Sequence, residues 1–192
     1  MKPSRPHLAA AARAFSLIEL LLVVVIFAVL AGMALTGFNS VSTSTKIQRA
    51  GDAVADALIL SRQQALTRNA IVDMRIFSDT TGRYRSFQLF ERQGTNLSAV
   101  SRKTTLPEGI QFLDSLSPLL ASAPTASLPA PCRLITLQPN GEPLLPAAIS
   151  SDLSSGYLTI GMERDAAGSG FPQNYATVFI NPYTGLVNIY RP

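Results

Sequence analysis

Residues 20–35 form an unbroken apolar run that contains neither a charge nor a strong hydrogen-bonding side chain. The run widens to residues 15–38, where the single charged side chain is Glu19. A helix of this length covers roughly 30 Å or slightly more, which matches the hydrocarbon core of a bilayer. Backbone polar groups inside lipid must be satisfied within the segment itself. We therefore expect residues 15–38 to form a membrane-spanning helix.

The first fourteen residues, MKPSRPHLAAAARA, are basic and contain no acidic side chain. Lys2, Arg5 and Arg13 precede the apolar run, which predicts a single-pass topology with a cytoplasmic N-terminus and the C-terminal domain on the other side of the membrane. Without these three residues, the chain has 13 basic and 12 acidic side chains. The basic excess therefore belongs mainly to a targeting segment and gives little reason to expect nucleic-acid binding.

Glu19 does not suit an ordinary membrane anchor, because a carboxylate in an apolar span costs a few kcal/mol and usually has a function. Cleavage after Ala14 would create an ammonium group on Phe15, one helical turn from Glu19, that could pair with it. Three other interpretations stay open. The segment could be a secretory signal peptide cut near Ala34, a plain signal anchor in which Glu19 is incidental, or a buried helix of a globular protein.

The letters AFSLIE at positions 14–19, followed by the apolar run, resemble the cleavage and methylation motif of type IV prepilins and pseudopilins. The resemblance implies that a prepilin peptidase cuts the Ala14–Phe15 bond and methylates the amine of Phe15. It also implies that Glu19 aids docking and register in a filament of pilins, which an inner-membrane assembly platform extends. Two positions depart from the family pattern, since Ala14 replaces the usual Gly and Thr36 stands where many relatives carry Pro.

The remainder of the chain divides into an amphipathic helical segment, 39–69, and a β-rich segment, 70–192. One face of the helix carries small and apolar side chains: Ile47, Ala50, Val54, Ala57, Leu58, Ser61 and Ala65. Leu66 lies at the edge of this face. Alternating patterns and turn signals predict strands near 72–76, 84–92, 106–112, 134–137, 157–162, 176–180 and 186–190. The first two and the last two should form hairpins. Residues 115–131, rich in Pro, Ser and Ala, are predicted to be a loop.

This second half resembles minor pilins of the GspH and FimT type. The resemblance is carried by SRQQALTRN at 61–69, LPEGIQF at 106–112, ITLQPNGEP at 135–143 and VFINPYTGLVNIY at 178–190. It implies an α+β fold, in which a long N-terminal hydrophobic helix packs on a C-terminal antiparallel β-sheet domain. The expected function is that of a structural subunit, a minor pilin or pseudopilin of a type IV pilus or a type II secretion pseudopilus.

Enzymatic chemistry finds little support in the sequence. The single histidine, His7, lies in the leader, so the processed chain would lack Ser-His-Asp and Cys-His catalysis and any histidine-containing zinc site. Cys132 is the single cysteine, so no intrachain disulfide can form, and we expect it to be a small loop or core residue. We expect no catalytic residue, metal or cofactor.

Two alternative functions stay open. Some FimT-like minor pilins bind DNA through a Gly-Arg-x-Arg motif, and residues 82–85 have these letters. Arg83, Arg85 and Arg191 are therefore possible DNA contacts, with Arg75, Arg92, Arg102 and Lys103 extending the basic strip. The competing interpretation, which we favour, is an edge hairpin whose charges prevent aggregation, with no nucleic-acid partner. The last alternative is a membrane-anchored β domain unrelated to filaments.

Overall fold

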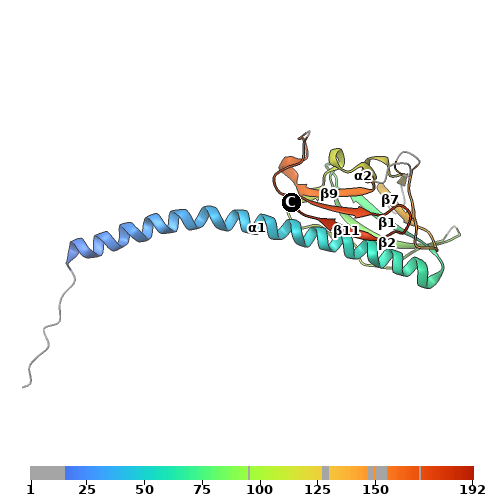
Figure 1. Ribbon diagram of the computed structural model, residues 1–192, viewed down its shortest axis with the longest axis horizontal. Coiled ribbons are helices and arrows are strands. Elements are labelled where there is room, and N and C mark those ends of the chain that lie inside the picture. Colours follow the sequence, from blue (N-terminus) through green and yellow to red (C-terminus); the bar gives the residue numbers. More distant parts are fainter. Residues whose placement is uncertain (1–15, 95, 127–129, 147–148, 150–154, 169) are drawn as a thin grey trace, which may run out of the picture. The chain divides into compact units, whose positions relative to one another are not determined.

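The computed structural model of the chain describes residues 16–192, apart from 95, 127–129, 147–148, 150–154 and 169. For residues 33–41 it describes the backbone alone. The chain divides into two units, Met1–Val41 and Ser42–Pro192. Helix α1, Leu17–Arg68, provides the helix of the first unit and the first element of the second (Figure 1). Within the described residues, no helix combines the length and the hydropathy needed to cross a membrane.

Helix α1 contains no proline in its 52 residues, so nothing in its sequence interrupts the backbone hydrogen bonds. The helix ends at Arg68, and the next residue, Asn69, adopts a left-handed conformation with φ 48°. The amide of Ala70 then donates to the carbonyl of Ala65 at 3.2 Å, which closes the last turn. Asparagine tolerates this conformation better than most residues, so Asn69 fixes the point where the chain reverses into the first strand.

The second half of α1 buries the face that the sequence predicts. Leu66, at the edge of the predicted apolar face, is exposed. Every member of the face itself is buried: Ile47, Ala50, Val54, Ala57, Leu58, Ser61 and Ala65. The hydroxyl of Ser61 donates to the carbonyl of Ala57 at 2.7 Å, so this polar group is satisfied inside the helix. The helix thus buries its small apolar face and ends at Arg68.

The first of two antiparallel sheets has the strand order β3-β2-β1-β7-β6, with β4 added to β2 and β8 added to β7. Strands β1 and β2 form the predicted hairpin, in which Asp73 lies opposite Phe90. The bounds are β1 Ile71–Ser78, β2 Tyr84–Gln93, β3 Asn96–Ala99, β4 Thr104–Thr105, β6 Thr125–Ala126, β7 Cys132–Leu137 and β8 Pro143–Leu144.

The second sheet has the order β11-β10-β9-β5, and its neighbours are also antiparallel. Its strands are β5 Ile110–Phe112, β9 Tyr157–Met162, β10 Ala176–Ile180 and β11 Val187–Tyr190. Strands β10 and β11 form the predicted C-terminal hairpin. A short 3-10 helix, η3 Glu163–Asp165, follows β9 directly. The predicted α+β class, a helix followed by an antiparallel β domain, is confirmed.

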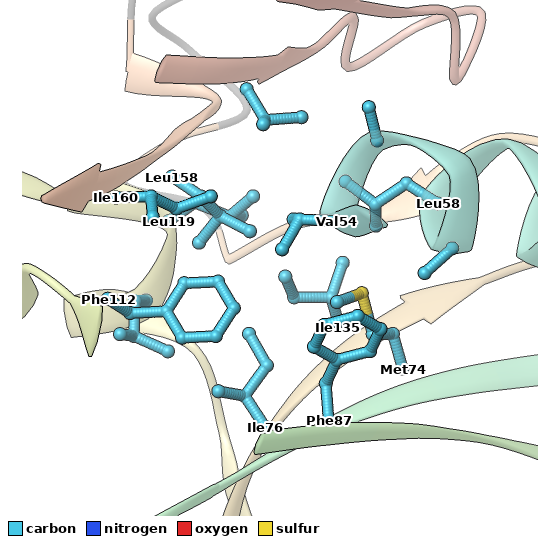
Figure 2. Packing of buried hydrophobic residues seen from close by; sticks show 14 of the residues in the cluster. Val54, Leu58, Met74, Ile76, Phe87, Phe112, Leu119, Ile135, Leu158 and Ile160 are labelled. Atoms are coloured by element: carbon cyan, nitrogen blue, oxygen red, sulfur yellow. The ribbon is translucent and has the colours of Figure 1, made fainter. Parts of the chain in front are cut away.

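One hydrophobic core joins the second half of α1 to both sheets (Figure 2). Val54 and Leu58 of α1 belong to one buried cluster with residues of both sheets, and the rings of Phe87 and Phe112 meet edge to face with centroids 6.5 Å apart. Fully burying one such side chain contributes about 1.5–3 kcal/mol relative to leaving it exposed. The α1 face and the two sheets therefore stabilise each other, and neither sheet is an independent layer.

The prediction of a loop at 115–131 differs from the structure. After the 3-10 turn η1, Asp114–Leu116, the chain forms α2, Pro118–Ser122, and then the short strand β6. Pro118 occupies the first turn of α2, where its missing N–H costs nothing. Leu119 and Leu120 belong to the main core. Pro118 therefore starts a helix within the predicted loop, and this helix contributes two residues to the core.

Candidate functional site

The start of α1 is the part of the candidate site that the structure describes. Ala14 and Phe15, the predicted cleavage and methylation residues, lie outside the described residues. The carbonyl of Ser16 accepts hydrogen bonds from the amides of Glu19 at 3.0 Å and Leu20 at 3.2 Å. Glu19 is exposed in the first helical turn. A carboxylate at this position is stabilised by the positive end of the helix dipole.

The side chains around and beyond Glu19 are apolar and uncovered. From Leu17 to Leu30, every large hydrophobic side chain is between 43% and 81% exposed. Such side chains occur on all sides of the helix, and no polar face interrupts them. Soluble proteins rarely expose apolar surface on this scale, because its transfer from water is strongly favourable. This helical segment therefore differs from an ordinary surface helix, which carries a polar face toward water.

The three candidate DNA contacts do not form a set of free positive charges. Arg83 makes an ion pair with Glu163, and Arg191 makes one with Asp52 of α1. The side chain of Arg85 is half-buried, and its Nε has no hydrogen-bond partner among the described residues. Two of the three guanidinium charges are therefore compensated inside the chain, which weakens their attraction for phosphates.

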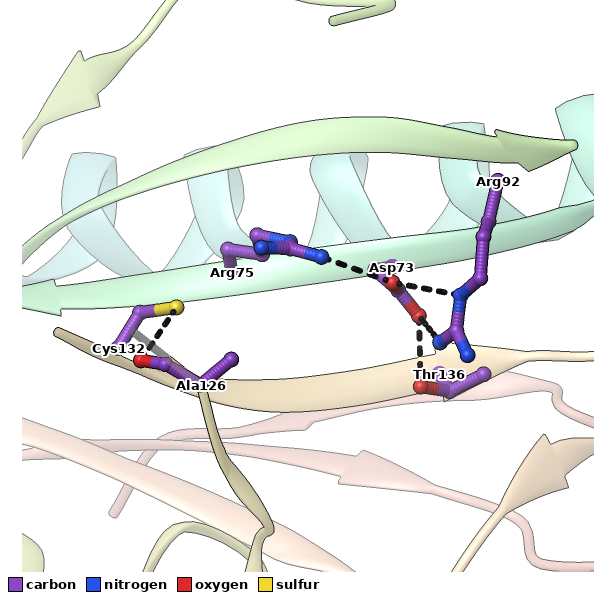
Figure 3. A network of polar contacts seen from close by, with 6 residues as sticks. All are labelled: Asp73, Arg75, Arg92, Ala126, Cys132 and Thr136. Carbon is purple, nitrogen blue, oxygen red and sulfur yellow. Dashed lines mark hydrogen bonds and ion pairs between the residues drawn. The ribbon is translucent and has the colours of Figure 1, made fainter. Parts of the chain in front are cut away.

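Arg75, Arg92 and Lys103, three of the four other residues of the basic strip, are also engaged. Arg75 and Arg92 turn toward the carboxylate of Asp73 (Figure 3). The ammonium of Lys103 lies 4.7 Å from the ring centre of Phe77, a cation–π contact. These cations stabilise the sheet to which they belong.

Asp73 is the centre of a buried polar network on the face of β1 opposite the main core. Its Oδ1 accepts hydrogen bonds from Arg92 Nη2 at 2.6 Å and Thr136 Oγ1 at 2.7 Å. Its Oδ2 accepts from Arg92 Nε at 3.2 Å and Arg75 Nη2 at 3.4 Å. The two bonds from Arg92 form a bidentate pair, which is among the strongest polar contacts in proteins. This network ties β1 to both of its neighbours, β2 and β7.

Cys132, at the start of β7, is buried beside Phe77 and Phe90. Its thiol donates to the carbonyl of Ala126 at 3.6 Å. Burial raises the pKa of this thiol above its ordinary value, because the thiolate would lose hydration. The expectation that Cys132 is a core residue is confirmed, and the thiol is poorly suited to nucleophilic chemistry.

Sequence reasoning missed two features of this part of the molecule. The alternation in β1 identified a strand but gave no sign that Asp73 and Arg75 would be buried. Glu163 pairs with Arg83, and nothing in the local sequence around either residue indicates this contact. The opposite charges of these residues were visible in the sequence, but which charges meet depends on strand pairing, which local patterns do not reveal. Among the described residues, no cluster of three or more His, Cys, Asp or Glu side chains could hold a metal.

Comparisons with known proteins found a match to the N-terminal sequence and matches to the fold. Residues 10–35 match the family model of the prokaryotic N-terminal methylation motif. No curated protein matches the chain significantly. A solved structure of the minor pseudopilin EpsH from the type 2 secretion system of Vibrio cholerae superposes with a TM-score of 0.50 at 16% identity, covering 77% of this chain and 98% of that one.

The type IV minor pilin FimU of Pseudomonas aeruginosa gives a TM-score of 0.46 at 13% identity, covering 77% of this chain and 93% of that one. The resemblance predicted from the sequence is confirmed by the match of residues 10–35 to the N-terminal methylation motif and by the structural match to EpsH. The chain carries the prokaryotic N-terminal methylation motif ahead of an α+β domain with the fold of a minor pseudopilin.

Proposed function

We propose that this chain is a minor pilin or pseudopilin, a structural subunit of a type IV pilus or a type II secretion pseudopilus. The observation that carries the proposal is the apolar first half of α1, whose large side chains are exposed from Leu17 to Leu30 directly behind Glu19. The matched methylation motif at 10–35 covers this same segment. The fold of the second unit, similar to that of EpsH, adds support.

In this proposal, residues 1–14 are a leader that a prepilin peptidase removes by cutting the Ala14–Phe15 bond. The enzyme then methylates the amine of Phe15. Residues 15–38 hold the subunit in the bacterial inner membrane, with the leader in the cytoplasm and residues 70–192 on the other side. Residues 39–69 continue the helix onto the β domain. The basic leader and the apolar run support this orientation.

Assembly exchanges one apolar environment for another. An inner-membrane platform draws the subunit into the filament, where residues 15–38 pack against the helices of other pilins. Apolar side chains lose little in this exchange, because neighbouring helices replace lipid. Glu19 is different, since a carboxylate among apolar helices needs a positive partner. The amine of a neighbouring Phe15 would supply this charge and fix the register of the incoming subunit.

The test replaces Glu19 with valine and measures incorporation into filaments by immunoblotting of sheared or overproduced filaments. Glu19→Val should be cut and held in the membrane normally, because the apolar run is intact. Its incorporation should fall by at least about tenfold, since a lost ion pair of a few kcal/mol exceeds the 1.4 kcal/mol that a tenfold effect requires. Asp56→Val, which removes a carboxylate from the exposed face of the same helix, is the matched control.

Incorporation of Glu19→Val at the wild-type level would show that Glu19 does not set register. Mass spectrometry of the N-terminal peptide tests the processing step separately, and the expected species begins with methylated Phe15. A chain that starts at Met1 or at Leu35 would contradict the proposed processing. A DNA-binding role receives no support from the geometry, because Arg83 and Arg191 already pair with acidic side chains.

A further inference from the structure

The turn between β7 and β8 contains Asn140 followed by Gly141, which is the single Asn-Gly pair in the sequence. In such a pair, the backbone nitrogen of the glycine can attack the side-chain carbonyl carbon of the asparagine. Glycine has no Cβ to hinder the approach, and its backbone rotates freely. A cyclic succinimide forms and ammonia leaves, so the asparagine is lost. Asn140 is therefore the asparagine of this chain whose following residue most readily allows deamidation.

In the folded chain, hydrogen bonds hold both of the groups that would react. The amide of Gly141, the nucleophile, donates to the carbonyl of Gln138 at 2.8 Å. The carboxamide of Asn140 is held at both ends, since its Nδ2 donates to Glu142 Oε2 at 2.8 Å and its Oδ1 accepts from the amide of Glu142 at 3.0 Å. Ring closure requires the carboxamide to rotate toward the nitrogen of Gly141. These bonds must therefore open before the reaction can begin.

The surroundings of Gly141 leave the turn little room to rearrange. Gly141 is buried, and the side chain of Leu66 on α1 lies 3.2 Å from the position that a Cβ would occupy. On the other side, a Cβ on Gly185 would collide with the carbonyl oxygen of Gly141, so the turn after β10 packs directly on this backbone. Arg62 Nε donates to the carbonyl of Thr184 at 2.9 Å, which ties that second turn to α1. Opening the Asn-Gly turn therefore disturbs its contacts with both neighbours.

The products of deamidation fit this turn worse than asparagine does. Water opens the succinimide at either carbonyl and gives aspartate or isoaspartate. An aspartate would place a carboxylate beside that of Glu142, so an attractive hydrogen bond would become a repulsion between like charges. Isoaspartate carries the main chain through the side-chain methylene, which lengthens the backbone by one atom. Close packing on Leu66 and Gly185 leaves no space for this extra atom.

We propose that Asn140 is a deamidation site that the native fold protects and that loss of the local fold exposes. The nitrogen of Gly141 forms a bond to Cγ of Asn140, the Cγ–Nδ2 bond breaks, and ammonia leaves with the amide proton. Water then hydrolyses the ring. Because the products do not fit the closed turn, the reaction irreversibly marks chains that have stayed unfolded. This inference does not require the proposed filament role and would stand if that role were refuted.

The test compares the rate of deamidation in the native and the unfolded chain. The full chain is kept in non-ionic detergent at mildly alkaline pH, with or without guanidinium chloride, and tryptic digests are followed by mass spectrometry. Peptide 134–164 contains Asn140 as its single asparagine, and peptide 165–192, with three asparagines that no glycine follows, is the internal reference. Conversion of Asn140 should be at least about tenfold slower in the native chain, because the hydrogen bonds of the turn must open first.

Two substitutions loosen the turn and leave the reacting pair intact. Glu142→Ala removes the acceptor of Asn140 Nδ2, and Leu66→Ala removes the side chain that packs on Gly141. Each should raise the native rate by about two- to tenfold and leave the rate in guanidinium chloride unchanged. Ile59→Ala, which shortens another exposed apolar side chain of α1, is the matched control and should keep both wild-type rates.

A second measurement tests whether the products fit the fold. Chains converted in guanidinium chloride are refolded by dilution, and their thermal midpoint should lie below that of unconverted chains treated in the same way. Asn140→Asp adds the charge without lengthening the backbone, so its midpoint should fall less than that of isoaspartate-containing chains.

Equal rates at Asn140 in the native and the unfolded chain would overturn the proposal, as would the absence of conversion in guanidinium chloride. Wild-type native rates in both Glu142→Ala and Leu66→Ala would show that the contacts of the turn give no protection. Converted chains that refold with an unchanged midpoint would refute the poor fit of the products.

Discussion

Replacing Asp73 with asparagine tests how strongly the buried polar network holds the first sheet together. The substitution keeps the shape of the side chain but removes its negative charge. Arg92 would lose the bidentate partner that it contacts at 2.6 and 3.2 Å, and Arg75 would lose its contact at 3.4 Å. Thr136 would keep a carbonyl oxygen as a possible acceptor. The variant therefore isolates the charge of Asp73 from its packing.

The expected destabilisation follows from the exposure of the two arginines. Removing one partner of a fully buried ion pair costs about 3–5 kcal/mol. The Arg92 side chain is 38% exposed and can turn toward water, so its part of the loss is reduced by solvent screening. Arg75 is buried and retains its contact with the ring of Phe90 at 5.1 Å. We expect a loss of about 2–3 kcal/mol of unfolding free energy for Asp73→Asn.

Circular dichroism of the detergent-solubilised chain measures this effect as a shift of the thermal midpoint. For a unit of this size, 1 kcal/mol corresponds to about 2–4 °C, so the midpoint should fall by about 4–12 °C. Asp52→Asn is the matched control, because Asp52 is 56% exposed in its pair with Arg191. An exposed pair contributes about 0–1 kcal/mol, and the control should shift by less than about 4 °C.

The comparison of the two variants shows whether the buried ion pair of Asp73 contributes more stability than the exposed pair of Asp52. If Asp73→Asn and Asp52→Asn lower the midpoint equally, burial does not distinguish the two ion pairs and the reasoning is wrong. A rise in the midpoint of Asp73→Asn would show that the desolvation cost of the charge exceeds its attraction for the arginines.

Two further predictions concern a turn and a close backbone contact. Hydrogen bonds from the Thr81 hydroxyl and the Arg83 amide lower the pKa of Asp79, so its stabilising effect is present above the ordinary aspartate pKa and is lost as pH falls through the lowered value. The difference in thermal midpoint between the wild type and Asp79→Asn should therefore shrink in acid, and a constant difference would contradict this. Gly156→Ala would place a Cβ 2.7 Å from the carbonyl oxygen of Ile180, at a cost of about 1–3 kcal/mol, whereas Gly170→Ala meets no atom within 4 Å. Equal midpoints for these two glycine variants would refute the close contact.

The sequence predicted the elements whose patterns are local. The small apolar face from Ile47 to Ala65 repeats with the helical period, and the strands alternate with period two. Each pattern is set by residues close together in the chain, so the α1 face and the two hairpins were predicted correctly. The loop prediction at 115–131 was wrong in part, because Pro118 starts a short helix, where proline is well tolerated.

Long-range features of the fold left no local signal. Division into two sheets, with β7 beside β1 and β5 beside β9, brings together segments far apart in the sequence. The burial of Asp73 and the unsatisfied acceptor of Gln111 both depend on these pairings. The apolar run and Glu19 were visible at once, because they rest on composition alone. The candidate assembly segment was therefore predictable, and the contacts that depend on long-range strand pairing were not.

Because Cys132 is buried, the native chain is suitable for selective labelling of cysteines introduced elsewhere. It is the single cysteine, and its thiol is buried, with a pKa raised by burial. The thiolate is the nucleophile that attacks thiol reagents, so this side chain should react slowly while the fold is intact. A cysteine introduced at an exposed position should then be labelled selectively without first replacing Cys132. Spin labels or crosslinkers could in this way be attached along α1 or around β5, with the original core unchanged.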